Sequence, residues 1–367
     1  MTSPRTTSLR RLTQFSSHLS ESSRSFSSAA SSNSPVNHAS YCATLSPAPV
    51  PSPVDIKALR ASLLARPEVL TPDYLSPMPS TLLNASLADF LPAAAIPPSP
   101  VQNSEHDPPA APLAEAYHLI HFPLQLQPAL LVADGTDPYP LPGAPFERRL
   151  WAGGRITWHR PLYTRGQKAV CMEKITDVNV KGKQGEEKIF VDVVRRYGDG
   201  ETFAAGEEAV TESRTLVFMK GRTPEEAKAE MAKGGRNVRA SQKPSFKHTF
   251  TPTPTLLFNY SALTYNAHQI HLNPQYCREV EGHRDLLVHG PLSLTLMLSV
   301  LRSQLGNDEK IRSIDYRNLA PLYVGEPLTI CVRLHADKGG EEKKWDVWVE
   351  NSQGGLSVKG TVVVGPV

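Results

Sequence analysis

Residues 289–302 read HGPLSLTLMLSVLR, and this apolar run decides the fold that the rest of the chain must adopt. Pro291 stands near its start, which suits a first helical turn because the N–H that proline lacks would find no helical partner there. From Pro291 onward the spacing predicts a helix of about 16 residues, about 24 Å long. Apolar side chains cover nearly every side of this helix, so other elements must enclose it.

Stretches that alternate apolar and polar residues follow this helix, with glycine-containing turns between them. They span residues 311–319, 327–335, 344–350 and 356–364, and the alternation predicts antiparallel strands. A buried helix followed by an antiparallel sheet that curls around it is the arrangement called a hotdog fold. Residues 148–219 contain similar strands. We therefore expect an α+β double hotdog, in which two antiparallel sheets each wrap a central helix and the first copy is degenerate.

The segments around these strands differ in composition and suggest domain boundaries. Residues 55–220 carry the first hotdog, with proline-rich loops and helices packed outside its sheet. Residues 221–247 are rich in basic residues and lack a strong apolar pattern, which favours a mobile linker. Residues 248–367 form the second hotdog and contain the candidate site.

Residues 1–54 have the composition of an organellar transit peptide, with sixteen serines, four arginines and a single acid, Glu21. Residues 9–15 can form a short basic amphipathic helix, which an inside-negative membrane potential attracts. Arg24-Ser25-Phe26-Ser27 resembles a matrix-protease cleavage site. We therefore expect a disordered transit segment and the mitochondrial matrix as destination. An untargeted disordered tail is the alternative.

Composition and motifs argue against several kinds of partner. The net charge of +3 is too small to predict nucleic-acid binding, and no apolar run approaches the roughly 18 residues that a membrane span needs. No G-x-G-x-x-G follows a strand, so no nucleotide cofactor is expected. The cysteines lie far apart without a C-x-x-C pair, which predicts free thiols and no metal site. They are Cys42, Cys171, Cys277 and Cys331.

Titratable and polar residues gather in two stretches of the second half. Residues 258–273 read FNYSALTYNAHQIHLN, and Val288-His289-Gly290-Pro291 comes about eighteen residues later, directly before the buried helix. The N–H of Gly290 would lie at the positive end of that helix, where glycine lets a carbonyl oxygen approach. Such an N–H, together with the helix dipole, can stabilise an oxyanion.

These two stretches resemble the MaoC-like (R)-specific enoyl-thioester hydratases and 3-hydroxyacyl-thioester dehydratases. That family carries S-G-D-x-N-P-x-H, followed downstream by His-Gly at the central helix. The resemblance places the family histidine on His271, the acid position on Asn266 and the helix-start glycine on Gly290. One subgroup of this family resembles the chain more than the others do, in the motif variant at residues 260–271 and in the block RRLWAGGR at 148–155. This subgroup contains fungal-type mitochondrial 3-hydroxyacyl-thioester dehydratases and mesaconyl-CoA hydratase-like proteins.

The resemblance implies roles for individual residues. His271 would remove the C2 proton and later protonate the leaving hydroxyl, since histidine titrates close to neutral pH. Asn266 replaces the family acid and cannot accept a proton, but it can still hold a hydroxyl or water. Tyr265, His268 and His289 are candidate substrate contacts. For Tyr265 the alternative is packing, for His268 a bond to backbone or to Asp285, and for His289 a structural role at the helix entry.

The function implied is a hydro-lyase that interconverts (3R)-3-hydroxyacyl and trans-2-enoyl thioesters in mitochondrial type II fatty acid synthesis. A catabolic mesaconyl-CoA-type hydratase and a non-catalytic hotdog that binds an acyl carrier are the alternatives. Thioester hydrolysis is weaker, since residues 258–273 offer no carboxylate. Acyl carrier protein and coenzyme A both stay open as carriers, as do a monomeric double hotdog and a homodimer. The basic segment 221–247 can attract an acidic carrier protein or simply face water.

Overall fold

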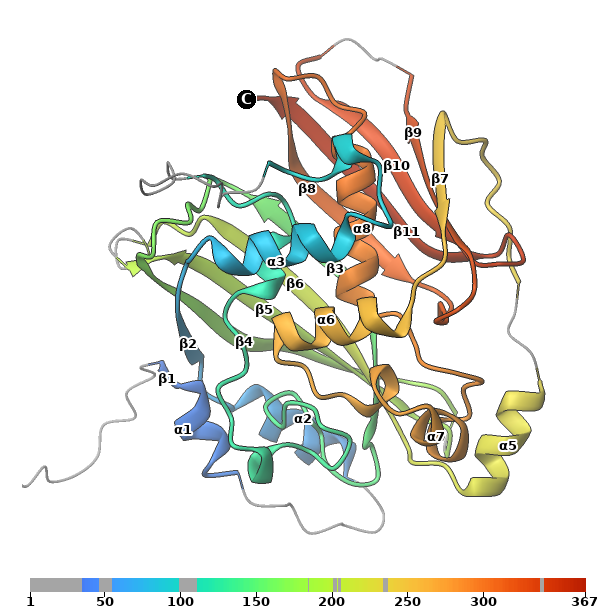
Figure 1. The fold of residues 1–367 in the computed structure, drawn as a ribbon. Helices are drawn as coiled ribbons and strands as arrows, with labels where there is room; N and C mark the ends of the chain where they lie inside the picture. Colours follow the sequence, from blue (N-terminus) through green and yellow to red (C-terminus); the bar gives the residue numbers. More distant parts are fainter. Residues whose placement is uncertain are drawn as a thin grey trace, which may run out of the picture. The chain divides into compact units, whose positions relative to one another are not determined.

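Eleven strands form one continuous sheet in the computed structural model, which describes residues 35–45, 55–98, 111–183, 185–200, 203, 206–233, 237–336 and 340–367 (Figure 1). The strands are β1 (Val36–Asn37), β2 (Val69–Tyr74), β3 (Arg148–Trp158), β4 (Lys168–Lys181), β5 (Lys188–Asp199), β6 (Val210–Met219), β7 (Phe246–Phe250), β8 (Glu309–Asn318), β9 (Leu328–Leu334), β10 (Lys343–Glu350) and β11 (Leu356–Pro366). Their order across the sheet is β1-β2-β4-β5-β6-β3-β8-β11-β10-β9-β7. The predicted strands are present in both halves, and the bounds predicted in the second half agree with β8, β9, β10 and β11 to within two residues.

Helices and short turns lie against this sheet and at its ends (Figure 1). The helices are α1 (His38–Cys42), α2 (Ile56–Leu64), α3 (Met78–Leu87), α5 (Pro224–Ala232), α6 (Pro254–Thr264), α7 (Pro274–Tyr276) and α8 (Gly290–Arg302). Short 3-10 turns cover Ala93–Ala95, Tyr117–Ile120, Pro128–Leu130 and Gln269–His271, and a π turn covers Cys277–Glu281. Within these described ranges, each helix is too short or too polar to cross a membrane.

Helix α8 forms the centre of the second half. Its residues 292–301 are all buried, and it packs against β8, β9 and β10. The prediction of an enclosed apolar helix is therefore confirmed. The helix has 13 residues and ends at Arg302, where a turn over 303–305 begins, so it is shorter than predicted. In the first half, Leu83 and Leu87 of α3 share a buried cluster with strand residues such as Cys171.

The two half-sheets are joined edge to edge where β3 pairs antiparallel with β8, from Gly153 opposite Arg317 to Thr157 opposite Ser313. Glycine is required at this junction, because a Cβ on Gly153 would lie 2.3 Å from the Tyr316 carbonyl oxygen. Gly153 also has a φ of +151°, which other residues rarely adopt. The two sheets expected from the sequence thus form a single surface. It is antiparallel except at its first edge, where β1 runs parallel to β2.

Residues 35–45 belong to the fold, which corrects part of the boundary drawn at residue 54. Val36 pairs with Val69 in the sheet, and His38 and Cys42 of α1 are buried. Composition placed this short stretch with the serine-rich tail because two strand residues and a five-residue helix leave almost no periodic signal. The predicted transit helix and cleavage motif lie outside the described residues.

The segment 221–247 is also more ordered in structure than the predicted linker. Helix α5 starts at a capping box, in which the Thr223 hydroxyl accepts the Glu226 N–H and the Glu226 carboxylate accepts the Thr223 N–H. Residues 246–250 form β7, which pairs with β9 at the far edge of the sheet. A search for apolar periodicity misses α5 because polar residues dominate it, whereas the Thr-Pro-Glu-Glu run is itself a helix-start signal.

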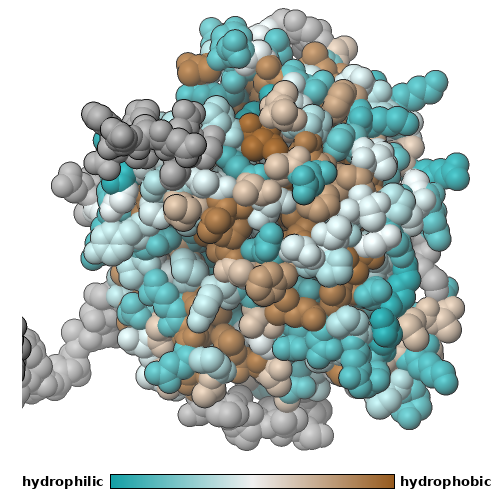
Figure 2. All heavy atoms as spheres, in the orientation of Figure 1, coloured by the Kyte–Doolittle hydropathy of each residue, from teal (hydrophilic) through white to brown (hydrophobic). Residues whose placement is uncertain are grey.

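The surface over α3 and α6 carries exposed apolar side chains, including Met78, Leu82 and Phe258. Figure 2 shows hydrophobic residues gathered in patches between hydrophilic ones on the face that it draws. The two helices are in contact with each other, and the Asn259 amide donates to the Ser86 hydroxyl over 3.2 Å. This contact holds α6, and the candidate site that follows it, against the first half of the chain.

Candidate active site

One cavity of about 520 Å³ collects most of the residues that the sequence singled out. Its wall includes Tyr265, Asn266, His268, His271 and Gly290. Both halves of the chain contribute, since side chains of β3, β4, β5 and β6 form the opposite wall. The two predicted stretches are therefore brought to one cavity, which extends well into the first half of the chain.

The imidazole of His271 lies in the cavity wall with a defined proton position. The ring ends the 3-10 turn after α6, and its Nδ1 lies 2.8 Å from the carbonyl oxygen of Leu287. A carbonyl can only accept, so Nδ1 carries the hydrogen and Nε2 carries the lone pair. Burial lowers the pKa of His271 to about 4. At neutral pH the residue is therefore a neutral base with one free nitrogen.

His289 lies behind His271 and not on the cavity wall. The two imidazoles stack with ring centroids 3.6 Å apart, and Nε2 of His289 lies 2.8 Å from the Ser261 hydroxyl. Burial, reinforced by His271 and His268, lowers the pKa of His289 well below its usual range, so the stacked rings do not repel each other as cations. This placement agrees with the structural alternative for His289 and gives no direct substrate contact.

Asn266 shapes the loop that presents His271. Its Oδ1 accepts the His268 N–H over 3.0 Å, while its own N–H donates to the Ser261 carbonyl over 2.8 Å. Tyr265 before it has a φ of 51°, a left-handed conformation that ends α6 and turns the chain into the cavity wall. Asn266 itself lines the cavity.

His268 contacts Asp134 rather than Asp285, the partner considered from the sequence. Its Nε2 lies 3.5 Å from Oδ2 of Asp134, and the Gln269 N–H donates to the Asp134 carbonyl over 2.9 Å. Burial, with His271 and Arg149 nearby, lowers the pKa of His268 well below its usual range. The contact therefore joins a neutral histidine to a carboxylate, and it ties the site loop to the first half of the chain.

Gly290 is the first residue of α8, so its N–H has no acceptor within the helix. A Cβ at this position would lie 3.1 Å from Nδ2 of Asn318 and 3.6 Å from Cβ of Trp151, so the wall is closely built around the glycine. Asn318 is itself held by a 2.8 Å bond to the Trp151 carbonyl. The Gly290 N–H is therefore a hydrogen-bond donor at the positive end of α8, and Gly290 lines the same cavity as His271.

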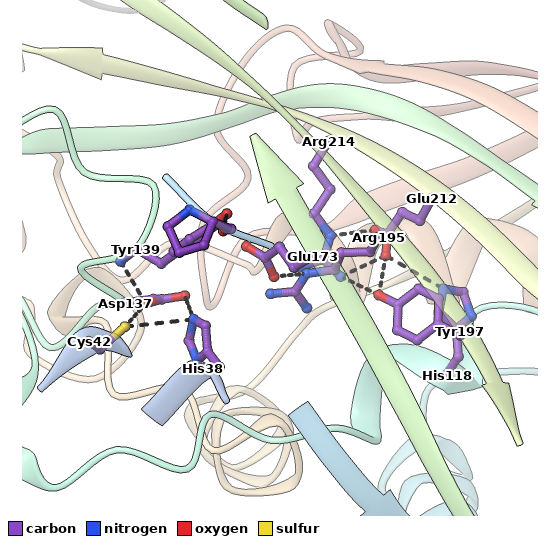
Figure 3. Close-up of polar contacts among 11 residues, drawn as sticks. His38, Cys42, His118, Asp137, Tyr139, Glu173, Arg195, Tyr197, Glu212 and Arg214 are labelled. Atoms are coloured by element: carbon purple, nitrogen blue, oxygen red, sulfur yellow. Dashed lines mark hydrogen bonds and ion pairs between the residues drawn. The ribbon is translucent and has the colours of Figure 1, made fainter. Parts of the chain in front are cut away.

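Three arginines of the first half also line the cavity. Arg214 pairs with Glu212 through two bonds of 2.6 and 2.8 Å, and Arg195 pairs with Glu173 (Figure 3). Arg149 donates to the Asp137 carbonyl over 3.0 Å and forms no direct ion pair among the described residues. It is a partly buried cation on the cavity wall, and the charges of Asp134, Asp137 and Glu173 act on it from a distance.

Sequence reasoning missed Asp134, Asn318 and Arg214, which carry no local motif and reach the site only through the fold. Arg149 and Trp151 lie inside the block RRLWAGGR at 148–155. The sequence therefore drew attention to these two residues but indicated no role for them. No described residue near His271 supplies a metal-ligand cluster. A neutral imidazole and a backbone N–H at a helix start on one cavity wall can support proton transfer and oxyanion binding.

The chain is similar in sequence to thioester dehydratases and hydratases. A family model described as hydroxyacyl-thioester dehydratase type 2 matches residues 116–324. The mitochondrial hydroxyacyl-thioester dehydratase type 2 of Schizosaccharomyces pombe is 29% identical over 290 residues, which cover 72% of this chain and 90% of that protein. The mesaconyl-C(4)-CoA hydratase of Chloroflexus aurantiacus is 28% identical over 257 residues, which cover 70% of this chain and 85% of that protein.

Solved structures show the same fold. The MaoC-like dehydratase of Phytophthora capsici superposes with a TM-score of 0.57 at 16% identity, covering 83% of this chain and 97% of its own. A second MaoC-like dehydratase gives a TM-score of 0.56 at 15% identity over 83% of this chain and 99% of its own. The predicted fold class, a double hotdog, is confirmed by these similarities.

Proposed function

Because the chain belongs to the hydroxyacyl-thioester dehydratase type 2 family, we propose that it converts (3R)-3-hydroxyacyl thioesters to trans-2-enoyl thioesters and water, and catalyses the reverse hydration. The protein is a hydro-lyase, and this family assignment argues against the non-catalytic alternative. One observation carries the choice of residues: the His271 imidazole and the Gly290 N–H, nineteen positions apart in sequence, lie on the wall of one cavity.

The reaction uses His271 twice. Its Nε2 takes the C2 proton of the substrate, and the electron pair of the broken C–H bond moves toward the thioester carbonyl. The Gly290 N–H donates to the oxygen on which the negative charge then builds. The imidazolium next gives its proton to the departing 3-hydroxyl, the C2–C3 double bond forms, and water leaves. Because the low pKa of His271 makes its protonated form a strong acid, this second proton transfer is favoured.

The cellular setting that we propose is type II fatty acid synthesis in the mitochondrial matrix, with the substrate carried by acyl carrier protein. Two similar proteins, the hydroxyacyl-thioester dehydratases type 2 of Schizosaccharomyces pombe and Saccharomyces cerevisiae, are mitochondrial. The arginine- and serine-rich composition of residues 1–54 agrees with that location. Comparing KM for the same enoyl group on acyl carrier protein and on coenzyme A tests the carrier. A KM at least ten times lower on acyl carrier protein is expected, and equal values would contradict this choice.

The basic test is hydration of crotonyl-CoA by the purified protein, followed as loss of enoyl absorbance. Replacing His271 by Ala should lower kcat/KM by at least about 100-fold, the usual contribution of a positioned acid–base group. His335→Ala is a suitable control, because His335 pairs with Asp346 away from the cavity. Unchanged activity in His271→Ala would overturn the mechanism.

A hydratase of dicarboxyl-CoA substrates is a second candidate, and Arg149 favours it. A guanidinium without a carboxylate partner on the cavity wall can bind the distal carboxylate of such an acyl group. If this is the substrate, Arg149→Gln should lower kcat/KM for mesaconyl-CoA at least tenfold and leave crotonyl-CoA almost unaffected. Lys188→Gln, another cation on the wall, is the matched control. Equal losses with both thioesters would argue against a dicarboxyl substrate.

A further inference from the structure

Three side chains with metal-binding atoms converge where α1 meets the loop before β3 (Figure 3). Nε2 of His38 lies 3.2 Å from Oδ2 of Asp137 and 3.8 Å from Sγ of Cys42, and Sγ lies 3.9 Å from Oδ1 of Asp137. We propose that His38, Cys42 and Asp137 bind a divalent metal ion, and that Zn²⁺ suits this donor set best. The site is separate from His271, and the proposed hydro-lyase chemistry does not depend on it.

The donor spacing matches tetrahedral zinc closely. With bonds of about 2.3 Å to sulfur and about 2.1 Å to nitrogen and oxygen, tetrahedral angles require about 3.4 Å between N and O, and about 3.6 Å between S and either. The two distances from Nε2 of His38, to Oδ2 of Asp137 and to Sγ of Cys42, lie within about 0.4 Å of these values. The 3.9 Å distance from Sγ is to the other carboxylate oxygen, Oδ1, and one ligand atom from each of the three residues lies within 4.8 Å of the other two. One ion can therefore reach one atom of each residue after side-chain adjustments.

The arrangement differs from that of a nucleophilic cysteine triad. In such a triad the thiol and the carboxylate face opposite nitrogens of the histidine ring. Here Cys42 and Asp137 both face Nε2, whereas Nδ1 of His38 is buried and has no hydrogen-bond partner among the described residues. Three donors of different chemistry thus point at one location, as metal ligands do.

The surrounding structure holds the donors in place. His38 and Cys42 are four residues apart in α1, which brings them to one side of the helix, and both are almost fully buried, at 3% and 2% exposure. The Asn37 side chain caps α1 by accepting the Ser40 N–H. Oδ1 of Asp137 also accepts the Tyr139 N–H over 2.9 Å, which orients the carboxylate.

A fourth coordination position is accessible from the cavity, because His38 and Asp137 line its wall. A water or a substrate oxygen can occupy that position, as in other zinc sites with three protein ligands. The ion would tie residues 35–45 to the loop that carries both Asp137 and Asp134. Since Asp134 contacts His268, the metal would also stiffen the support of the catalytic loop. Sequence spacing does not reveal such a site, because Asp137 is 95 positions from Cys42.

The test is a Co²⁺ titration of the purified full chain after treatment with a chelator, since Co²⁺ replaces Zn²⁺ and reports its ligands by absorption. We expect one Co²⁺ per chain and a thiolate-to-cobalt charge-transfer band in the near ultraviolet. The band should disappear in Cys42→Ser and persist in Cys331→Ser, which alters another buried free thiol. Zn²⁺ should raise the unfolding midpoint of the wild type and of Cys331→Ser, but not of Cys42→Ser.

Absence of the thiolate band in the wild-type chain would overturn the proposal, as would an unchanged band in Cys42→Ser. Asp137→Asn serves as a second variant if Cys42→Ser fails to fold by circular dichroism. It keeps the shape of the side chain and should weaken Co²⁺ binding at least tenfold. Equal Co²⁺ affinity in Asp137→Asn and the wild type would also reject the site.

Discussion

At the scale of single residues, the protonation and the tautomer of His271 have separate causes. Burial lowers its pKa to about 4, and the Leu287 carbonyl decides which nitrogen carries the hydrogen. A free base with this pKa stays unprotonated across the physiological range. We therefore predict that kcat/KM is flat from about pH 5 upward and falls only below it, with an apparent pKa near 4.

Rapid pH-jump assays test this profile, because they measure initial rates before the protein unfolds in acid. His335→Ala, outside the cavity, should lose kcat/KM at the same low pH as the wild type. A decline of kcat/KM with an apparent pKa near the ordinary histidine value, about 6.5, would show that the base is not the buried imidazole described above.

A second residue-scale prediction concerns Asn266→Asp. The Asp oxygen can still accept the His268 N–H, so the loop should keep its shape. Residue 266 lines the same cavity as His271. A carboxylate there favours the imidazolium, so the low-pH decline of kcat/KM should move upward by about one pH unit or more. Asn259→Asp is the control, since Asn259 bonds to Ser86 outside the cavity. An unshifted decline in Asn266→Asp would place residue 266 away from the reacting base.

The motif singled out His271, Asn266 and Gly290 from short stretches of sequence, and the structure places all three on one cavity wall, while their catalytic roles stay predictions. The motif did not indicate the residues that contact these three. Asp134 and Asn318 contact the site from loops and strands far along the chain, and no local pattern marks an aspartate or asparagine as a neighbour of a histidine. The stacking of His289 on His271 likewise depends on a relative orientation that only the packed structure defines.

At the scale of elements, the start of α8 combines core packing with the proposed oxyanion donor. In Gly290→Ala the N–H remains, but the new methyl group would stand 3.1 Å from Nδ2 of Asn318 and narrow the approach to that donor. Because one such donor is usually worth a factor of about 100 to 1,000 in kcat, we predict a fall in kcat/KM of at least about tenfold.

The accompanying unfolding midpoint should stay close to that of the wild type, because the Asn318 side chain can shift by a few tenths of an ångström. Gly221→Ala is the matched control, since a Cβ there meets no atom within 4 Å. Full activity in Gly290→Ala would mean that the acyl carbonyl does not approach this end of α8.

Elements with a strong alternating pattern were predicted well, and elements with a weak one were not. Strands such as β4 and β5 bury alternate residues over most of their length, so the period of two is visible in the sequence. Helix α5 lacks an apolar pattern, and strand β7 is only five residues long; α5 and the first two residues of β7 were assigned to a linker. Their order comes from a capping box and from pairing with β9, respectively.

At the scale of the whole molecule, burial of several histidines makes stability depend on pH. Burial lowers the pKa of five of them, namely His118, His268, His271, His283 and His289. In the unfolded chain these groups bind protons below about pH 6.5, while the folded chain resists protonation. The contribution of these histidines to the free energy of unfolding is thus complete above about pH 6.5 and is lost as pH falls toward 4.

We therefore predict that the free energy of unfolding in urea is lower at pH 5 than at pH 7.5. His38 acts in the opposite direction, because burial is outweighed by the Asp137 carboxylate, which raises the pKa of His38 to about 11. For His283, whose pKa is lowered to about 4, the maximum contribution is about 3 kcal/mol. His283→Gln should show a smaller pH dependence than the wild type, whereas His335→Gln should keep it. A stability that does not change between these two pH values would contradict the prediction.

The pairing of the two halves was beyond prediction because alternation defines strands but not their neighbours. That β3 would lie beside β8 depends on Gly153, which allows the Tyr316 carbonyl oxygen to approach closely but resembles an ordinary turn residue in the sequence.

The continuous sheet also restricts how a thioester can enter. Because the β3–β8 ladder connects the walls of the cavity, the halves cannot swing apart like the domains of a hinged enzyme without breaking backbone hydrogen bonds. Substrate exchange should then proceed without separation of the halves, and Tyr265, which is exposed and also lines the cavity, lies where cavity and solvent meet.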